Sequence, residues 1–294
     1  MPVAAVLGWP LTHTLSPRLH QAAYRAADLG DWRYLARPTP PEELPAALQE
    51  VRAGALTGVN LTTPHKQAAV PLLDGLEPPA DALGAVNTVW RAGDPAGLVG
   101  ANTDVPGALW SLRRQLGLAG GGWDGSGPAL LVGTGGVALA VALAWARLTE
   151  SRRKLGLETC PLTVTGRSAE RAGRMAAHAG EGAATVGWEE AAEAVAAAAV
   201  LVQATTLTAK GEAVPGQDRL RPGVRVLELN YGPSAQGLVE ASRRAGAAAA
   251  ADGLGMLCAQ AAEAVTRMAG IPPEQAFTAM AAEVGLSLMD PAAR

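Results

Sequence analysis

Short apolar runs alternate with longer amphipathic segments along the first part of the chain. The apolar runs lie at 3–7, 32–36, 57–61, 85–90 and 98–99, and helical spacing is found at 17–27, 41–52, 64–73 and 105–116. Strands that alternate with helices predict βαβ units. The first half of the chain is therefore expected to be an α/β domain with a mainly parallel sheet.

A glycine-rich stretch, Gly117–Pro128, interrupts this pattern and predicts a loop near a domain edge. A second alternating series follows it. Strands are expected at 129–132, 162–165, 200–203, 224–229 and 247–251, with helices at 136–149, 169–178 and 234–245. The last segment reads as two helices around Gly270-Ile-Pro-Pro273. A second α/β domain is the simplest interpretation.

Composition excludes several classes of protein. The chain has 294 residues, 49% of them hydrophobic, and a formal net charge of −3, which argues against binding to a nucleic acid. Cys160 and Cys258 have no neighbouring Cys or His at metal-ligand spacing, so neither a disulfide framework nor a metal site is expected. The N-terminus does not resemble a signal peptide, and the absence of a long apolar run argues against a membrane span. The expected location is the cytoplasm.

The stretch Leu130-Leu-Val-Gly-Thr-Gly-Gly-Val-Ala138 places a glycine pattern directly after an apolar run and before a predicted helix. This pattern indicates a dinucleotide-binding turn, because its glycines let backbone N–H groups approach a pyrophosphate at a helix N-terminus. The alternative is a tight turn without a ligand. The candidate coenzyme residues are Gly133, Thr134, Gly135, Gly136, Val137 and Ala138.

The residues after the next predicted strand indicate which coenzyme is bound. An acidic residue there would favour NAD, but the strand 162–165 is followed by Gly166-Arg167-Ser168. Arg167 and Ser168 can donate hydrogen bonds to a 2′-phosphate, so NADP(H) is the predicted coenzyme. The alternative is an ordinary solvated arginine at a helix start.

Four polar clusters occur at successive strand–helix junctions of the first half. They are Thr14 with Ser16, the stretch GVNLTTPHK at 58–66, Asn87 in GAVNTV, and Asn102-Thr103-Asp104. Each alone could be a helix cap or a satisfied core amide. Together they predict a shared ligand site, because ligands of α/β sheets gather at the carboxyl ends of strands. His13 and His20 lie nearby, but an isolated histidine is more often structural.

Eight motifs in this order resemble the shikimate dehydrogenase family. They are HTLSPRLH, GVNLTTPHK, GAVNTV, GANTDVPG, GTGGVA, GRS, LNYGP and DGLGMLCAQA. The resemblance implies two α/β domains separated by a cleft, a substrate domain at 1–106 plus 253–294 and a Rossmann NADP-binding domain at 107–252. It also implies the reversible NADPH-dependent reduction of 3-dehydroshikimate to shikimate, in chorismate and aromatic amino acid biosynthesis, by a monomer or homodimer.

The resemblance also assigns residues. It makes Lys66 and Asp104 the catalytic pair. It implies substrate contacts from Thr14, Ser16, Asn60, Thr62, Asn87, Tyr231 and Gln260, and it adds Thr205, Gly253 and Met256 to the coenzyme site. This chain departs from the family pattern at Thr14, where serine is usual, at Gly166 and Gln203, where asparagine is usual, and at Glu228, where aspartate is usual. A mechanism follows, in which Lys66 protonates or stabilises the developing alkoxide while Asp104 holds the lysine.

Two alternatives remain at this stage. A quinate/shikimate dehydrogenase with broader substrate or NAD use would share nearly all of these residues. A non-catalytic ligand-sensing homologue would share the fold, but it would be expected to lack Lys66 or Asp104, and both are present.

Overall fold

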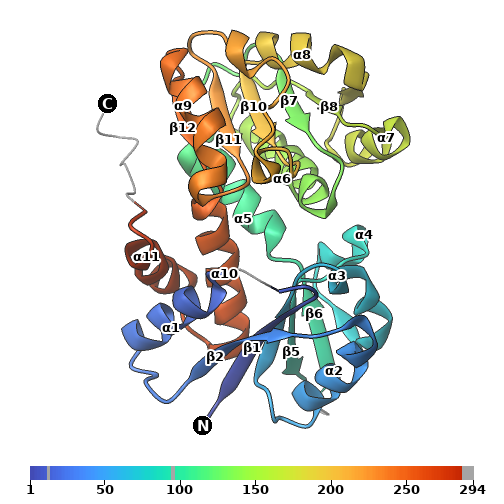
Figure 1. Ribbon diagram of the computed structural model, residues 1–294, viewed down its shortest axis with the longest axis vertical. Helices are drawn as coiled ribbons and strands as arrows, with labels where there is room; N and C mark the ends of the chain where they lie inside the picture. The colour runs from blue at the N-terminus through green and yellow to red at the C-terminus, as the bar shows by residue number, and fades with distance from the viewer. Residues whose placement is uncertain (12–13, 94–96, 287–294) are drawn as a thin grey trace. The chain divides into compact units, whose positions relative to one another are not determined.

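The computed structural model describes residues 1–11, 14–93 and 97–286 (Figure 1). They form two compact units. The first comprises Met1–Asp104 and the segment that begins at Cys258, and the second comprises Val105–Leu257. The domain ranges given above stay predictions, and their last residues, 287–294, lie outside the described part of the chain.

The sheet of the first unit is mixed. Its strands are β1 (Val3–Gly8), β2 (Arg33–Pro38), β3 (Gly58–Leu61), β4 (Gly75–Leu76), β5 (Thr88–Ala92) and β6 (Gly97–Ala101), in the order β2-β1-β3-β5-β6-β4. Strand β1 is parallel to β2 and β3, whereas β5 is antiparallel to both β3 and β6. The beginning of β5 therefore lies at the same edge of the sheet as the ends of β3 and β6.

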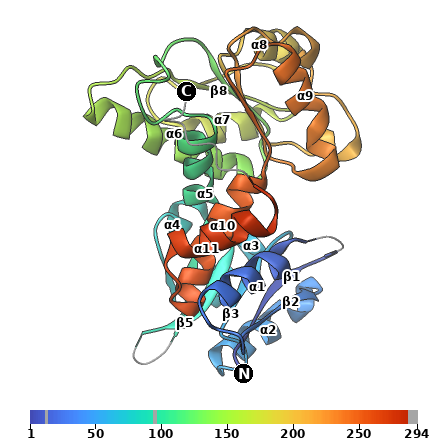
Figure 2. The same ribbon diagram turned by 90° about the vertical axis from the view of Figure 1, so that its left-hand side faces the viewer.

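Short helices and the C-terminal segment cover this sheet. The helices are α1 (Ser16–Ala26), α2 (Leu44–Arg52), α3 (His65–Ala68), α4 (Ala80–Leu83), the C-terminal part of α10 (Leu254–Ala269) and α11 (Pro273–Glu283), with 3₁₀ turns at Pro41–Glu43 and Val70–Leu72. Helices α1 and α11 lie side by side (Figure 2), and Glu283 forms ion pairs with Arg18 and Arg25 across them. Val59, Val89 and Leu98 are fully buried in the core beneath.

The second unit has a fully parallel sheet. Its strands are β7 (Ala129–Val132), β8 (Leu162–Thr165), β9 (Ala184–Thr185), β10 (Val200–Gln203), β11 (Arg225–Glu228) and β12 (Ala249–Ala251), in the order β12-β11-β10-β7-β8-β9. This is the strand order of dinucleotide-binding folds, with its switch point between β7 and β10. All residues of β7 are buried, as expected for a central strand covered on both faces.

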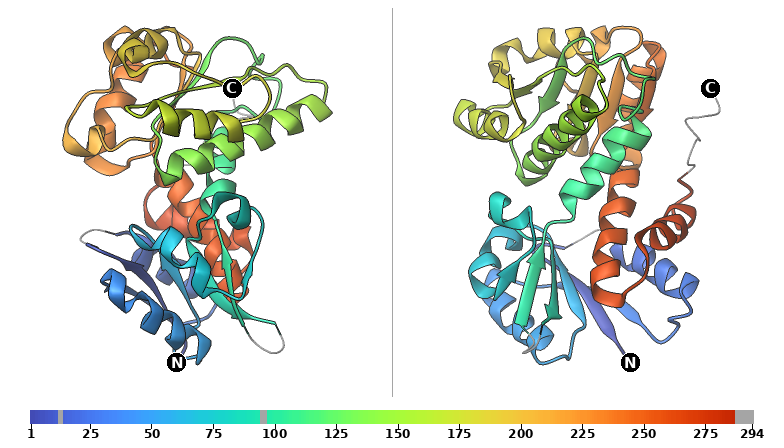
Figure 3. Two further views of the ribbon diagram at one scale, coloured as in Figure 1. Left: turned by 90° about the vertical axis from the view of Figure 1, so that its right-hand side faces the viewer. Right: turned by 180° about the vertical axis from the view of Figure 1, so that it is seen from behind.

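Helices cover both faces of this second sheet. They are α5 (Asp104–Trp110) with a π-helical continuation at Ser111–Gln115, α6 (Gly136–Lys154), α7 (Ala169–His178), α8 (Ala191–Ala197) and α9 (Gln236–Arg244), with 3₁₀ turns at Trp188–Glu190, Thr208–Lys210, Gln217–Arg219 and Gly232–Ala235. Helices α6 and α7 lie on one face, and α8 and α9 lie on the other (Figure 3). None of the helices described is long and apolar enough to cross a membrane.

The predicted fold class, two α/β domains of which the second is Rossmann-like, is confirmed. Strands β7, β8 and β10 have the predicted bounds, and the helix expected to end at 149 continues to Lys154. The strand expected at 85–90 begins only at Thr88. Before it, the carbonyl of Ala85 accepts from Nδ2 of Asn102, and the side chain of Asn87 donates to Asp104. Elements α4, α8, β4 and β9 were not predicted, since segments of two to seven residues carry little periodicity.

A buried arginine holds the predicted glycine-rich loop of the second unit. Arg152 is 1% exposed and donates to the carbonyl oxygens of Leu118, Gly120, Trp123 and Glu158 at 2.7–2.9 Å. Its guanidinium also lies 4.7 Å from the Trp123 ring centroid. Leu118 and Trp123 are buried residues, and this one side chain satisfies carbonyls there that would otherwise lack partners.

Replacing Arg152 with methionine tests this role. The variant keeps most of the aliphatic volume but leaves four carbonyls without donors, so we expect the free energy of unfolding to fall by about 2–4 kcal/mol. Arg153→Met, at an exposed position of the same helix, is the matched control and should change it by less than about 0.5 kcal/mol. Urea denaturation followed by circular dichroism measures both. Equal midpoints for the two variants would contradict this account of the loop.

Candidate active site

Polar residues from three strands and their flanking loops gather at one edge of the first sheet. The register pairs Asn60 with Thr88 and Thr88 with Ala101, so the residues that follow β3, precede β5 and follow β6 are neighbours. This edge therefore brings together Lys66, Asn87 and Asp104, which lie far apart in the sequence.

Lys66 and Asp104 form a hydrogen-bonded ion pair. The distance from Lys66 Nζ to Asp104 Oδ2 is 2.6 Å, and the two side chains are 24% and 10% exposed. The backbone carbonyl of Lys66 accepts from the N–H of Val86 at 2.8 Å, which ties the start of α3 to the residues before β5. The ammonium is thus held in place but remains accessible.

Asn87 holds the other side of the Asp104 carboxylate. Its Nδ2 donates to Asp104 Oδ1 at 2.9 Å, and its Oδ1 accepts from the backbone N–H of Thr103 at 2.8 Å. The hydroxyls of Thr88 and Thr103 also contact Oδ1 at 3.1 Å. These donors fix the orientation of the amide, so its nitrogen is the atom that faces Asp104.

The Asn60 side chain forms more hydrogen bonds within the sheet than its predicted role as a substrate contact suggests. Its Nδ2 donates to the carbonyl of Asn87 at 3.1 Å and to Thr88 Oγ1 at 3.0 Å, and its Oδ1 accepts from the hydroxyl of Tyr34 at 2.6 Å. Both amide hydrogens are used in this way. A ligand hydroxyl could reach Asn60 only as a donor to Oδ1.

The two histidines near this edge are structural. His20 stacks on Tyr34 with ring centroids 3.8 Å apart, and burial lowers the pKa of its imidazole to about 3. His65 is fully buried and its Nε2 donates to the carbonyl of Thr39 at 2.8 Å. The interpretation of His20 and His65 as structural neighbours agrees with this geometry, whereas His13 lies outside the described residues.

Thr14 and Ser16 lie at the N-terminus of α1. Thr14 Oγ1 accepts from the backbone N–H of Ser16 at 3.1 Å and is also 3.1 Å from Ser16 Oγ. If the Thr14 hydroxyl donates to Ser16, the Ser16 hydrogen is available to a ligand. A helix N-terminus with a hydroxyl donor suits a carboxylate.

Thr62 and Gln260 belong to the same unit, although they lie far apart in the sequence. Gln260, on α10, is 3.2 Å from the Thr103 hydroxyl through its Oε1. Thr62 is partly exposed directly after β3, and its methyl group occupies the space where a side chain at Gly8 would lie. Tyr34 and Thr88 belong to this hydrogen-bonded set as well, although the sequence did not indicate them as site residues. Thr103, which lies in one of the predicted polar clusters, also belongs to it.

The glycine pattern of the second unit forms an open turn after β7. Gly133 has φ of +132°, and a Cβ there would lie 2.8 Å from the carbonyl oxygen of Ala204. At Gly135 and Gly136 a Cβ would meet nothing within 4 Å, so the start of α6 presents bare backbone. This cradle, at the N-terminus of a 19-residue helix, fits a pyrophosphate.

Arg167 and Ser168 follow β8, next to this turn in the sheet. Arg167 is exposed, and Ser168 caps α7 by accepting from the backbone N–H of Arg171 at 3.3 Å. A Cβ at Gly166 would lie 2.7 Å from Thr134 Cγ2, so the glycine gives room to the turn residue. The Arg167 guanidinium is free of the sheet and can bind a phosphate.

Three further predicted residues lie after β11 and β12, with Tyr231 and Gly253 on loops and Met256 near the start of α10. Tyr231 is partly buried, and burial raises the pKa of its hydroxyl. A Cβ at Gly253 would lie 2.2 Å from the carbonyl oxygen of Leu229, so only glycine fits there. Met256 is 6% exposed, which leaves little of its side chain for a coenzyme in this conformation.

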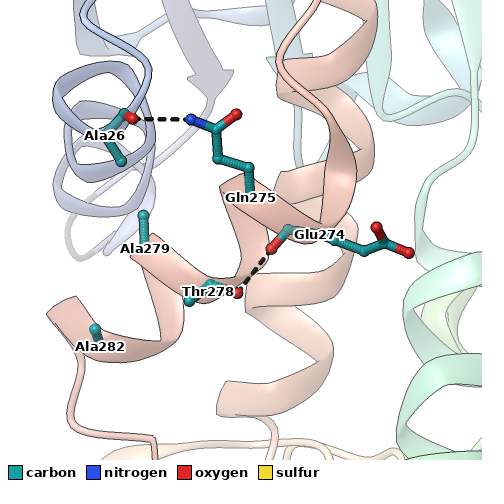
Figure 4. Close-up of a pocket in the computed structure, with 6 residues that line it drawn as sticks. All are labelled: Ala26, Glu274, Gln275, Thr278, Ala279 and Ala282. Atoms are coloured by element: carbon teal, nitrogen blue, oxygen red, sulfur yellow. Dashed lines mark hydrogen bonds between the residues drawn. The ribbon is translucent and has the colours of Figure 1, made fainter.

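A separate hollow between α1 and α11 has no chemistry of this kind. Its volume is about 470 Å³, and it is lined by Ala26, Glu274, Gln275, Thr278, Ala279 and Ala282 (Figure 4). Gln275 donates to the carbonyl of Ala26, and Glu274 points away from α1. The hollow is a packing feature of the seam between two helices.

Known proteins are similar to this chain over most of its length. Residues 6–89 match the model of the shikimate dehydrogenase substrate binding domain. A shikimate dehydrogenase (NADP(+)) of Rubrobacter xylanophilus is 36% identical over 276 residues, which cover 92% of this chain and 92% of the relative. The chain belongs to the shikimate dehydrogenase family.

Two further comparisons cover nearly the whole length of this family member. The shikimate dehydrogenase (NADP(+)) of Rhodospirillum rubrum is 36% identical over 291 residues, covering 96% of this chain and 97% of the relative. The crystal structure of shikimate 5-dehydrogenase from Thermus thermophilus in complex with NADP(H) and shikimate has a TM-score of 0.75 and 34% identity, covering 96% of this chain and all of that one. The predicted family is confirmed.

An isosteric change at Asn87 tests the contact network of this family member. In Asn87→Asp, a second carboxylate would replace the amide donor that faces Asp104 at 2.9 Å. Repulsion raises the pKa of the new carboxyl above its unfolded value, so the variant is penalised above that pKa and recovers as the pH falls and the group is protonated. We expect a loss of about 1–3 kcal/mol in unfolding free energy at pH 7 and a smaller loss at pH 4.

The matched control is Gln49→Glu, which adds a charge at an exposed position of α2 in the same unit. Thermal denaturation of both variants and the wild type across pH 4–8 gives the comparison. A penalty at Asn87→Asp that did not shrink toward low pH would refute the direct contact between the side chains of residues 87 and 104.

Proposed function

We propose that the chain catalyses the reversible reduction of 3-dehydroshikimate to shikimate with NADP(H). The observation that carries this proposal is the Lys66–Asp104 pair, which is held at 2.6 Å on a polar strand edge and remains partly accessible. The names of the relatives, and the ligands in the Thermus thermophilus complex, support the same substrate and coenzyme.

The residues of the second unit fit NADP(H). The bare backbone at Gly135 and Gly136 suits the pyrophosphate, and Arg167 with Ser168 suits a 2′-phosphate, which NAD lacks. The bound coenzyme would supply the hydride for the reduction of the ketone. Val137, Ala138 and Thr205 would complete the site as predicted from the sequence.

The first unit supplies the groups that suit a polyhydroxylated cyclic acid. Ser16, oriented by Thr14 at the start of α1, would bind the carboxylate. Asn60 can accept a hydrogen bond from a ring hydroxyl. Asn87 contacts Asp104 directly, Gln260 contacts the neighbouring Thr103, and Thr62 follows β3. Tyr231 stays a predicted substrate contact.

Lys66 performs the proton transfer in this proposal. As hydride reaches the carbonyl carbon, negative charge develops on the oxygen, and the Lys66 ammonium donates a proton to it or stabilises it. Asp104 fixes the ammonium through Oδ2, and Asn87 keeps that carboxylate in position through Oδ1. In the reverse direction the same pair would accept the proton from the shikimate hydroxyl.

The product of the reaction would enter chorismate and aromatic amino acid biosynthesis. A cytoplasmic location and a monomeric or homodimeric state stay predictions from the sequence. A quinate/shikimate dehydrogenase is the second candidate, because Thr14 stands at the predicted carboxylate contact and could also face the extra hydroxyl of quinate.

Lys66→Ala is the direct test of the catalytic assignment. Removing the proton donor should lower kcat by about a hundredfold or more, with the affinity for NADPH nearly unchanged because Lys66 belongs to the substrate-binding unit. Lys154→Ala, at an exposed lysine of α6, is the control and should keep wild-type kcat. A Lys66→Ala kcat within about tenfold of wild type, under 1.4 kcal/mol of barrier, would show that the role is wrong.

A kinetic panel with shikimate and quinate, each with NADP and NAD, separates the candidate activities. We expect shikimate with NADP to give the highest kcat/KM, and Arg167→Ser to raise the KM for NADP about tenfold while leaving that for NAD unchanged. Arg174→Ser, at an exposed position of α7, serves as the matched control. Equal use of both coenzymes by the wild type, or a higher kcat/KM for quinate, would favour the second candidate.

A further inference from the structure

Two buried polar side chains end neighbouring strands of the second sheet. Gln203 is the last residue of β10 and Glu228 is the last residue of β11, and the register pairs them directly. Both are 0% exposed. A buried carboxylate usually has a cation beside it, but within the described part of the chain the hydrogen-bond partners of Glu228 are neutral amides and a hydroxyl. Burial raises the pKa of Glu228, and the hydrogen bonds from these groups lower it by a smaller amount.

The side-chain donors to Glu228 are Asn230, on the loop after β11, and Gln203, at the end of β10. Oε1 accepts from the backbone N–H and from Nδ2 of Asn230, both at 2.8 Å. Gln203 Nε2 lies 3.4 and 3.3 Å from Oε1 and Oε2. Asn230 Nδ2 also contacts the Thr205 carbonyl at 2.9 Å and Thr208 Oγ1 at 2.8 Å. Glu228 thus connects the loop after β11 to the loop after β10.

These two loops contact the glycines that are predicted to bind the coenzyme. Ala204, beside Gln203, is the residue whose carbonyl oxygen lies against Gly133 of the glycine turn. On the other side, Gly253 donates its N–H to the carbonyl of Asn230 at 3.0 Å. A shift of either loop would therefore move Thr205 directly and disturb the backbone next to Gly133 or Gly253.

We propose that Glu228 is a positioning residue of the coenzyme site, and that Gln203 is the hydrogen-bond partner through which it acts on the loop after β10. Glu228 does not touch the coenzyme in this proposal. It fixes the loops at Thr205 and Asn230, so that the coenzyme meets a surface already in its binding conformation. The inference rests on the proposed function, because it assumes that this edge of the sheet binds NADP(H).

The pattern of donors explains why an amide cannot replace the carboxylate at 228. In Glu228→Gln, Oε1 can still accept from Asn230, but the new Nε2 then faces Gln203 Nε2, donor against donor. Turning the Gln203 amide over would relieve that contact. It would also remove the oxygen that accepts from the N–H of Thr205, so one of the two loop contacts is lost in either orientation.

A reciprocal exchange restores the pairing between the two side chains and gives up the donation from Gln203 Nε2 to the carbonyl of Thr205. In the double variant Gln203→Glu/Glu228→Gln, a carboxylate at 203 can accept from Thr205 and from the amide of Gln at 228. The oxygen of that amide can accept from Asn230. The single variant Gln203→Glu instead places two buried carboxylates next to each other. The exchange therefore separates the pairing itself from the identity of either residue.

The test compares wild type, both single variants and the double variant by direct titration with NADPH and by steady-state kinetics. We expect Glu228→Gln to raise the Kd and KM for NADPH about tenfold, with kcat at saturating NADPH within threefold of wild type. Gln203→Glu should be at least as impaired, and the double variant should recover to within threefold of the wild-type Kd. Glu240→Gln, at an exposed position of α9, controls for loss of an acidic side chain and should bind as wild type does.

Other outcomes would overturn the inference. Glu228→Gln binding NADPH as tightly as wild type would remove the positioning role. A double variant whose Kd for NADPH was no lower than that of the worse single variant would do the same. So would a rise in Kd that paralleled a general loss of folded protein in circular dichroism. A wild-type chain that failed to bind NADPH would overturn the proposed function and this inference with it. Wild-type binding with an unaffected Glu228→Gln variant would overturn the inference alone.

Discussion

The Asp104 carboxylate is the point on which the first unit's site depends. One of its oxygens holds the Lys66 ammonium, and the other accepts from the Asn87 amide. The amide cannot turn over, because its own oxygen accepts from the backbone and hydroxyl of Thr103. A cation fixed in this way needs no rearrangement when charge develops on a substrate oxygen. In the proposed mechanism, the network supplies the positional precision that proton transfer requires.

The antiparallel direction of β5 makes this network possible. In a fully parallel sheet, the start of each strand lies at the edge opposite to the strand ends. Because β5 runs against β3 and β6, Asn87 at its start meets Asp104 after β6. The second unit keeps all its strands parallel and builds its site from bare backbone and loops. Its polar side chains, Gln203 and Glu228, lie beneath those loops.

Local patterns in the sequence predicted the parts of the structure that depend on neighbouring residues. The central strand β7 is a continuous apolar run, β10 is apolar up to its last residue, and β8 alternates leucine and valine with threonine. The glycine turn has a fixed spacing, and these strands and the turn were found with their bounds. Tyr34 and Thr88 were missed as site residues. The Tyr34 hydroxyl bonds to Asn60, which lies 26 residues later, and Asn60 bonds to Thr88, which lies another 28 residues later. These contacts depend on strand register, which cannot be read from one sequence.

The same long-range contacts change what Asn60 can do for a ligand. An asparagine has two amide hydrogens, and in this sheet both are already donated, to Thr88 and to the carbonyl of Asn87. Only its oxygen remains, whereas Lys66 can only donate. The edge therefore offers an acceptor and a donor of fixed polarity. A ketone oxygen can bind Lys66 but not Asn60, while a hydroxyl can bind either, so in the proposed function the ketone oxygen of the substrate is the one that faces the lysine.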